Sequence, residues 1–220
     1  MSRSVSQGGY AELHCHSYFS LLDGASSPEA LAARAAELGL AGLALTDHDS
    51  LAGAVRFWKA AQHAGLHAIF GGEVTLAGGA HLTLLAATQA GYANLCRLIT
   101  ASRQTVSPTV YTSAQAGNDA DNWAGKIAPA LTWEQLAAHA AGLIALTGCR
   151  RGLVAEALLR HDAAAADGVA RRLVDIFGAD SVFVELQHHD LPDDDWLMQR
   201  QVALARRLGL PLVATHNVHY

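Results

Sequence analysis

Several classes of residue are scarce in this chain, and each scarcity excludes a kind of protein. The three cysteines, Cys15, Cys96 and Cys149, are far apart and odd in number. They form no disulfide framework and indicate a reducing compartment. No run approaches the roughly 20 apolar residues that cross a bilayer, and the N-terminus lacks the apolar segment of a secretory signal. We therefore expect a cytoplasmic protein with no membrane partner.

Positive charge and aromatic side chains are also sparse. The formal net charge is −5, and Lys59 and Lys126 are the only lysines, so the chain lacks the overall basic character that binds nucleic acid. Aromatic residues make up 6% of the sequence, and the tryptophans show no pattern for stacking on single-stranded bases. No glycine-rich phosphate-binding motif follows the first predicted strand, which disfavours a nucleotide-binding fold.

The chain does contain a regular alternation of predicted strands and helices. Predicted strands lie at 10–16, 40–49, 66–76, 80–88, 143–152, 181–189 and 210–220. Predicted helices lie at 27–39, 50–65, 91–103, 132–142, 153–178 (with a break near 161–164) and 193–209. Residues 104–130 have no period and predict a long exposed loop. Repeated strand–helix units predict an α/β fold with a parallel sheet and helices outside it. A barrel of about seven strands fits this pattern, with an open doubly wound sheet as the alternative.

Histidine is abundant, with 12 residues, and many of them lie where a predicted strand ends. In a β/α barrel the carboxyl ends of the strands share one rim, where active sites are built. The polar residues at these ends are His14 and His16; Asp47, His48 and Asp49; Glu73; Cys149; Gln187, His188 and His189; and His216, Asn217 and His219. Side chains that are distant in sequence should therefore meet at one rim.

Two short motifs on this rim indicate a metal site. His14 and His16 lie one residue apart on an extended chain, which places both side chains on one face. Asn217 and His219 repeat that spacing. Imidazole, carboxylate and thiolate groups suit zinc, iron and manganese. A single pair would fit polar edge residues before a turn as well, but two pairs together with Glu73 and further histidines favour a metal centre.

The segments ELHCHSYFSLLDG, LALTDHDSL, GGEV, NLCRLI, LTGCRRG, VELQHH and VATHNVHY together resemble the PHP (polymerase and histidinol phosphatase) domain. The resemblance covers essentially the whole chain. It is strongest to the PHP domain that opens the α subunit of bacterial C-family DNA polymerases, with VATHNVHY most like the error-prone branch. It implies a distorted (β/α)7 barrel with a trinuclear metal cluster on its rim.

The resemblance also implies a domain organisation and partners. Residues 1–220 would be a single PHP domain at the start of a longer polymerase chain. That polymerase would bind DNA through the domains that follow, and it would work with other mutagenesis or replication proteins.

The metal ligands that the resemblance implies are unevenly present. One subsite would be His14, His16, Glu73 and residue 217, a second Glu73, Cys149 and a position near 101, and a third Asp23, His48 and His219. Asn217 stands where an aspartate is expected, and Ala101 where active relatives have a histidine.

These departures set the expected metal content. A neutral amide brings no charge, and two protein ligands hold zinc poorly. We therefore expect one or two divalent metals (zinc, manganese or iron), with the subsite of Asp23, His48 and His219 filled most reliably. Another side chain could replace the ligand missing at 101, and His188 is the first candidate for that replacement.

The remaining polar residues receive ordinary or open roles. The histidines expected in helices or away from the rim are His63, His67, His81, His139 and His161. By strand alternation Cys15 and His216 should face away from the site. Two pairs of residues keep alternative roles. Asp47 and Asp49 either orient His48 or cap a loop. Arg150 and Arg151 either hold a substrate phosphate or lie in solvent.

If metals bind, the resemblance implies phosphoester hydrolysis, with His14, His16 and Glu73 as the catalytic residues. The activity would be a 3′–5′ exonuclease or a phosphoesterase. The alternative is a degenerate structural module that stabilises the polymerase, which the residues at 101 and 217 favour. A free-standing small-molecule phosphatase fits the polymerase-type motifs less well.

Overall fold

The computed structural model describes residues 9–104 and 129–220. Its strands are β1 (Ala11–Glu12), β2 (Gly42–Leu45), β3 (His67–Thr75), β4 (His81–Ala86), β5 (Leu143–Leu146), β6 (Val182–Leu186) and β7 (Leu212–Ala214). Its helices are α1 (Pro28–Glu37), α2 (Ala54–Ala64), α3 (Gln89–Gln104), α4 (Trp133–Ala138), α5 (Leu153–Leu159), α6 (Ala163–Phe177) and α7 (Asp194–Leu208), with a short 3₁₀ turn η2 (Ala179–Ser181). The predicted elements are confirmed, including the break between α5 and α6. The loop predicted at 104–130 falls almost wholly outside the described residues.

Local sequence signals set the ends of the helices. The Ser27 side chain accepts a hydrogen bond from the backbone N–H of Ala30, and Pro28 occupies the first turn of α1. Thr132 and Gln135 form a reciprocal capping box at the start of α4. Gly65 ends α2 in the left-handed region, with φ of 67°. These short-range contacts explain why the helix boundaries could be predicted closely.

The seven strands form one sheet in the consecutive order β1-β2-β3-β4-β5-β6-β7. All neighbouring pairs are parallel except those of β4, which is antiparallel to both β3 and β5. A tight hairpin through Gly78 and Gly79, both with positive φ, reverses the chain between β3 and β4. The first residue of β4, His81, therefore pairs with Thr75 at the end of β3. The amino end of β4 shares the rim with the carboxyl ends of the other strands.

The two edges of the sheet approach each other beyond β1 and β7. Cys15 and Val218 form a parallel bridge. The His16 N–H donates to the Val218 carbonyl at 2.7 Å, and the Val218 N–H donates to the His14 carbonyl at 2.9 Å. The curled sheet confirms the predicted barrel of about seven strands. The doubly wound alternative is excluded because its strand order would reverse direction within the sheet.

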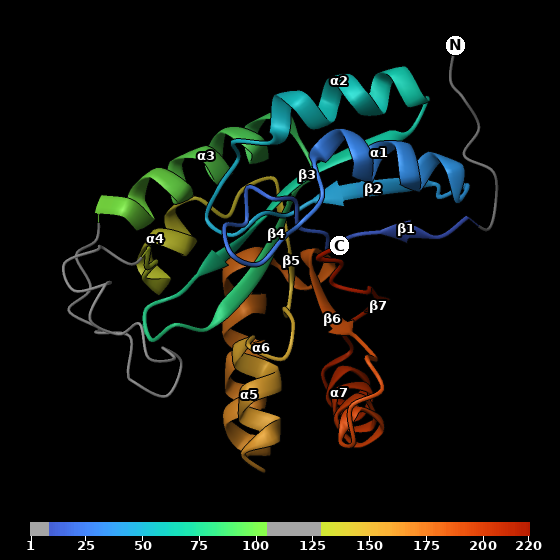
Figure 1. The fold of residues 1–220 in the computed structure, drawn as a ribbon. Helices are drawn as coiled ribbons and strands as arrows, with labels where there is room; N and C mark the ends of the chain where they lie inside the picture. The colour runs from blue at the N-terminus through green and yellow to red at the C-terminus, as the bar shows by residue number, and fades with distance from the viewer. Residues whose placement is uncertain (1–8, 105–128) are drawn as a thin grey trace, which may run out of the picture.

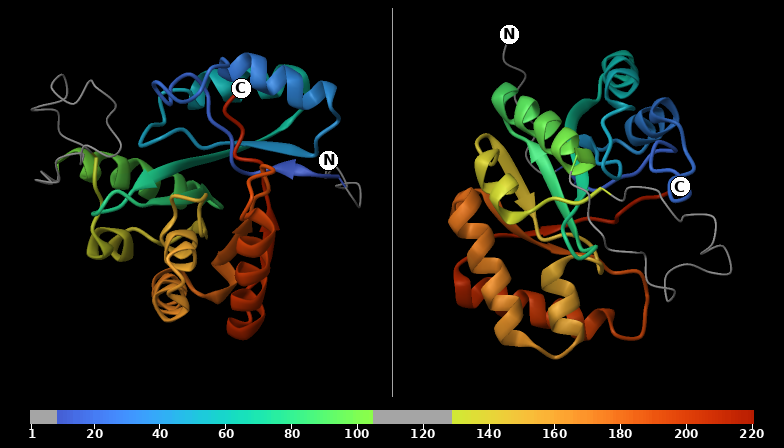
Figure 2. Two further views of the ribbon diagram at one scale, coloured as in Figure 1. Left: turned by 60° about the horizontal axis from the view of Figure 1, so that its bottom comes forward. Right: turned by 90° about the vertical axis from the view of Figure 1, so that its left-hand side faces the viewer.

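Helices pack against the curved sheet from two sides. Helices α1 and α2 lie together on one side, and α5, α6 and α7 lie on the other (Figures 1 and 2). On β2, Leu43 and Leu45 join the core under α1 and α2, whereas Ala44 joins a small inner cluster with Leu85 and Leu146. Within the described residues, no helix combines the length and apolar character needed to cross a bilayer. The sheet thus has an apolar interior whose polar rim carries the candidate site.

Candidate metal centre

Glu73, near the end of β3, is the hub of the polar residues on the rim, and it is 1% exposed. Its Oε1 lies 3.3 Å from both His14 Nε2 and Cys149 Sγ. Its Oε2 lies 2.9 Å from His48 Nδ1, 3.1 Å from His81 Nδ1 and 3.7 Å from His16 Nε2. We call His14, His16, Glu73, His81 and Cys149 the inner cluster. One buried carboxylate therefore presents each of its oxygens to a different group of ligands.

Two sets of side chains converge closely enough to hold an ion. The ligand atoms of His14, His16 and Glu73 lie within 4.8 Å of one another, as do those of His48, Glu73 and His81. Both sets contain Glu73, so the carboxylate stands between two potential metal positions. Imidazole nitrogens and carboxylate oxygens are the donor atoms that zinc, manganese and iron accept in proteins.

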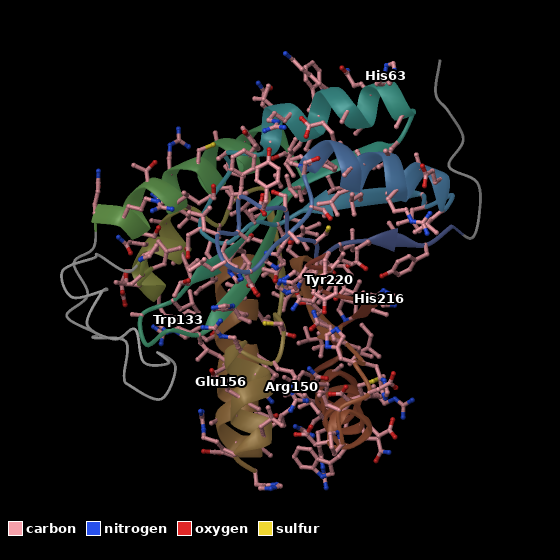
Figure 3. The ribbon with its side chains drawn as sticks, in the orientation of Figure 1. His63, Trp133, Arg150, Glu156, His216 and Tyr220 are labelled. Atoms are coloured by element: carbon pink, nitrogen blue, oxygen red, sulfur yellow. The ribbon has the colours of Figure 1, made fainter. Side chains whose placement is uncertain are left out.

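His14 and His16 lie in the extended segment that follows β1, and both are fully buried. Their rings lie together, with centroids 5.1 Å apart. Cys15, between them, is buried in the core under α1 and α2. His216 points away toward Tyr10 and is 68% exposed (Figure 3). The alternation predicted for these residues is confirmed.

The protonation of the two histidines differs. Burial by itself lowers the pKa of His14, but the carboxylates of Glu185 and Glu73 outweigh it and raise the pKa to about 10. Burial lowers the pKa of His16 to about 2, because Glu73 offsets only part of the desolvation and the neighbouring imidazoles oppose it. Without a metal, His14 therefore carries a proton between two carboxylates, whereas His16 is neutral.

Two further pKa values follow from the same contacts. Burial raises the pKa of a carboxyl group, yet contacts with His14, His48 and His81 hold the pKa of Glu73 well below its ordinary value. Burial, reinforced by the charge of Glu73, raises the pKa of the Cys149 thiol. The metal-free cluster thus contains an ionised carboxylate beside a protonated thiol.

A second, more exposed group adjoins the inner cluster, and we call Asp23, His48 and His219 the outer trio. Asp23 Oδ2 lies 2.8 Å from His48 Nε2, and Asp23 Oδ1 lies 3.3 Å from His219 Nδ1. The side chains are 43%, 21% and 23% exposed for Asp23, His48 and His219 respectively. The ring of His16 stacks on both histidines at 4.5 Å. The three residues converge as predicted, but at the solvent-facing side.

The loop that carries Asp23 depends on a glycine. A Cβ atom on Gly24 would lie 2.0 Å from the carbonyl oxygen of Ser17, so no other residue fits without moving the backbone. The neighbouring Ala25 N–H donates to the His219 carbonyl at 2.8 Å. These contacts hold the loop after β1 against the segment after β7, which brings Asp23 to His219.

Unpartnered imidazole nitrogens fit a cation site. His14 Nε2, His81 Nδ1 and His219 Nδ1 are buried, and none has a hydrogen-bond partner among the described residues. Each lies 3.1–3.3 Å from a carboxylate oxygen but without the alignment of a hydrogen bond. Buried polar atoms are rarely left unpaired because of the desolvation cost. A divalent metal accepting their lone pairs would satisfy all three, so the residues fit the group.

His81 corrects the sequence analysis, which set it aside as ordinary. It is 5% exposed and its ring meets that of His48 at 4.8 Å. The predicted rim contained only the carboxyl ends of strands, whereas β4 runs the other way and brings its amino end there. Ala101, where a ligand was sought, instead packs against the main core on α3. The second subsite is therefore not limited to Glu73 and Cys149.

The expectation that His188 replaces a missing ligand is wrong. Its side chain is 40% exposed and lies 3.2 Å from Asp195 and 3.5 Å from Asp190, both on the surface. Arg150, considered for a substrate phosphate, is engaged instead by Asp193 and Asp194 at the start of α7 (Figure 3). Neither side chain contacts the inner cluster in these interactions.

The two aspartates beside His48 have structural contacts. Asp47 accepts hydrogen bonds from the Ser17 N–H and from the hydroxyls of Ser17 and Ser20. The Ser20 oxygen in turn lies 3.0 Å from His16 Nδ1. The same Ser20 oxygen accepts the backbone N–H of His48 at 3.0 Å, so Asp47 acts through Ser20 on both His16 and His48. Asp49 accepts from the N–H and hydroxyl of Thr75, the loop-capping alternative.

Asn217 occupies the position where an aspartate was expected. Its Oδ1 lies 3.1 Å from His16 Nε2. Its backbone has φ of 49°, a left-handed conformation that asparagine and aspartate tolerate. The side chain therefore reaches the inner cluster, but it brings no negative charge.

Comparison with known proteins places the chain among related sequences. The PHP domain family model matches residues 12–189. An error-prone DNA polymerase of Symbiobacterium thermophilum is 44% identical over 96% of this chain and 19% of its own length. An error-prone DNA polymerase of Mycobacterium bovis is 40% identical over 99% of the chain and 19% of its own length. A DNA polymerase III subunit alpha of Treponema pallidum is 35% identical over 96% and 18%.

Solved structures share the fold at low sequence identity. A Bifidobacterium adolescentis protein described as a metal-dependent phosphoesterase superposes with a TM-score of 0.61 at 20% identity, covering 97% of this chain and 88% of that one. A Chromobacterium violaceum amidohydrolase gives a TM-score of 0.58 at 20% identity, covering 95% and 87%. The chain spans about a fifth of the length of the curated polymerases. It covers most of each of the two solved protein chains.

Proposed function

The chain belongs to the PHP domain family, and we propose that it is the metal-binding PHP domain of an error-prone DNA polymerase. Relatives with that name match almost the whole chain at 40–44% identity. On this proposal residues 1–220 are one domain of a longer cytoplasmic polymerase. DNA reaches the domain through the polymerase domains, which also link it to other replication or mutagenesis proteins.

We propose that the inner cluster holds two divalent metals (zinc, manganese or iron), with Glu73 between them. His14 and His16 serve one position, and His81 serves the other, where His48 Nδ1 also lies close. Cys149 lies beside Glu73 Oε1, the oxygen that faces His14, and supplements the first position. A neutral imidazole has one lone pair, so His48 joins either this position or the outer trio. The single observation that carries the proposal is the buried carboxylate of Glu73 with four imidazoles and a thiol around it.

The reaction that this arrangement favours is phosphoester hydrolysis. Bound metals would supply Lewis acidity that activates water and offsets charge on a phosphate. The protein buries His14, His16 and Glu73, which keeps bulk water from the ligand atoms. The partly exposed outer trio leaves one side open to solvent, and a phosphoester would approach from that side. The substrate would be the 3′ end of DNA or a smaller phosphoester.

The test combines metal analysis with hydrolysis assays. The purified chain is loaded with zinc, manganese or iron, and bound metal per chain is measured after removal of free ions. Hydrolysis of 3′-labelled DNA and of bis(p-nitrophenyl) phosphate is then followed with and without a chelator. We expect weak activity that the chelator abolishes and that His14→Ala lacks. Rapid degradation in chelator would contradict the mechanism.

The second candidate is a structural module that binds metal but does not cut. Asn217 favours this candidate, because its amide brings no negative charge to the metal position served by His14 and His16, where an aspartate would bring one. Metal bound at two equivalents without hydrolysis of either substrate would select this candidate. Loss of thermal stability on metal removal would then measure the structural contribution.

A further inference from the structure

We propose that Glu185 is a positioning residue that fixes the orientation and tautomer of His14 for metal binding. Glu185 lies on β6 and is fully buried. It is 171 positions away from His14 in sequence, yet its Oε1 lies 2.8 Å from His14 Nδ1. The inference rests on the proposed metal binding but concerns a side chain outside the candidate ligands.

The Glu185 carboxylate is itself held firmly. Its Oε1 also accepts a hydrogen bond from the Thr215 hydroxyl at 2.6 Å and from Gln187 Nε2 at 2.9 Å. Gln187 and Thr215 follow directly after β6 and β7, so the segments beyond these two neighbouring strands anchor the carboxylate. Its Oε2 is buried and has no partner among the described residues. All of its contacts thus act on the oxygen that faces His14.

This contact decides which nitrogen of His14 carries a lone pair. A neutral imidazole has one N–H and one lone pair. When Nδ1–H donates to Glu185, the lone pair lies on Nε2. That atom is buried, lacks a hydrogen-bond partner among the described residues and lies 3.3 Å from Glu73 Oε1. A carboxylate behind a histidine in this way fixes the ring and increases its basicity as a ligand.

His16 is held by a different device, which supports the interpretation. The Ser20 hydroxyl donates to Asp47, so its oxygen accepts the Nδ1–H of His16. His16 Nε2 then faces Glu73 and the Asn217 side-chain oxygen. Both histidines of the H-x-H motif therefore present Nε2 to the same carboxylate. Burying a charged group solely to fill space is costly compared with an apolar side chain, so the Glu185 charge needs such a role.

The primary test is Glu185→Gln, which keeps the shape and removes the charge. Zinc and manganese affinity are measured by competition with a chromophoric chelator, and folding by circular dichroism. Loss of such a partner typically weakens metal binding about 10- to 100-fold, and we expect a loss in that range. Asp194→Asn is the matched control, because Asp194 is equally buried but bonds to Arg150 and to the N–H groups of His189 and Leu191. It should leave metal affinity unchanged.

A double-mutant cycle separates positioning from general stability. If Glu185 acts through His14, Glu185→Gln should change the affinity of the remaining metal by less than about twofold in a His14→Gln background. Thr215→Val, which removes one donor to Glu185 Oε1, gives a milder variant in case Glu185→Gln does not fold. It should weaken metal binding in the same direction and by less.

The outcomes distinguish this inference from the proposed function. A folded Glu185→Gln that binds metal as tightly as wild type, or equal losses with and without His14, would overturn the positioning role. If Glu185→Gln does not fold, unchanged metal affinity in Thr215→Val would do the same. Wild-type protein that binds no metal would instead overturn the proposed function itself.

Discussion

The inner cluster and the outer trio contain similar side chains but differ in burial. His14, His16 and Glu73 are at most 1% exposed, whereas Asp23 is 43% exposed. In the inner cluster the surrounding strands hold each side chain before any metal arrives. In the outer trio, Asp23 lies on the loop after β1 and His219 lies after β7. The exposed carboxylate of Asp23 must become ordered when a metal binds. Burial, and not a complete set of expected ligands, should therefore rank the affinities.

This ranking reverses the order expected from sequence. The outer trio has every ligand that the family resemblance implies, so it was expected to fill first. The structure adds His81 to the inner cluster and shows that His48 Nδ1 lies 2.9 Å from Glu73. Because His48 can give only one lone pair, the outer trio competes with the inner cluster for it. We propose that the inner positions fill first.

The largest effect is expected from Glu73→Gln. The substitution keeps the size of the side chain but removes the charge common to both inner ligand sets. Metal bound per chain should fall to the outer position alone or to none. Elemental analysis of the loaded protein measures this directly, with Asp194→Asn as the control. Unchanged metal content would show that Glu73 is not a metal ligand.

The next test compares His81→Ala with His188→Ala. His81 lies 3.1 Å from Glu73 and is buried, whereas His188 is 40% exposed beside surface aspartates. His81→Ala should lose one equivalent of metal, and His188→Ala should lose none. The opposite result would show that His188, and not His81, replaces the ligand missing at 101.

The metal-free protein should show an unusual dependence of stability on pH. The pKa of His14 rises from 6.5 to about 10 on folding, so His14 stabilises the fold below pH 6.5 and that contribution is lost as pH rises through 10. The pKa of His16 falls to about 2 on folding, so the unfolded state binds the extra proton and stability falls as pH drops below 6.5. Together these histidines should place maximum stability near pH 6.5.

Urea unfolding in chelator across this pH range tests the prediction. His14→Gln should lose the decline that His14 causes between pH 6.5 and 10 and keep the acid-side decline. An identical alkaline slope in wild type and variant would contradict the proton held between Glu185 and Glu73.

A smaller effect is expected in the outer trio. Asp23→Asn removes one carboxylate that is 43% exposed and in contact with His48 and His219. Metal in the inner cluster should be retained, and only weakly held metal should be lost on dialysis. Loss of all metal would show that the two groups bind as one unit.

The smallest effect is expected from Asn217→Asp, which is a gain. The carboxylate would stand 3.1 Å from His16 Nε2, and aspartate tolerates the same left-handed backbone. The metal affinity of the position served by His14 and His16 should rise modestly, and any hydrolysis should rise with it. Gln62→Glu, at an exposed position on α2, serves as a charge-matched control. Equal affinity in both variants would show that Asn217 is not a ligand.

Much of this architecture could be predicted because its signals are local. Ser27, Pro28 and Gly65 mark helix ends through contacts within a turn. The direction of β4 was missed, although Gly78 and Gly79 between two apolar runs are typical of a hairpin. A hairpin reverses the strand, and that reversal is the reason His81 reaches the rim. Glu185 could likewise have been suspected, since it shares a strand face with Gln187.

The sequence by itself determined the elements, their order and the chemical types of the rim residues, because short-range propensity and spacing encode them. Only the tertiary structure decided which atoms meet. The pairing of His14 with Glu185 across 171 positions, and the sharing of Glu73 by four imidazoles, depend on how seven strands curl and on one reversed strand. Burial is likewise a property of the assembled fold and lowers the pKa of both His14 and His16, but at His14 the carboxylates of Glu185 and Glu73 outweigh it.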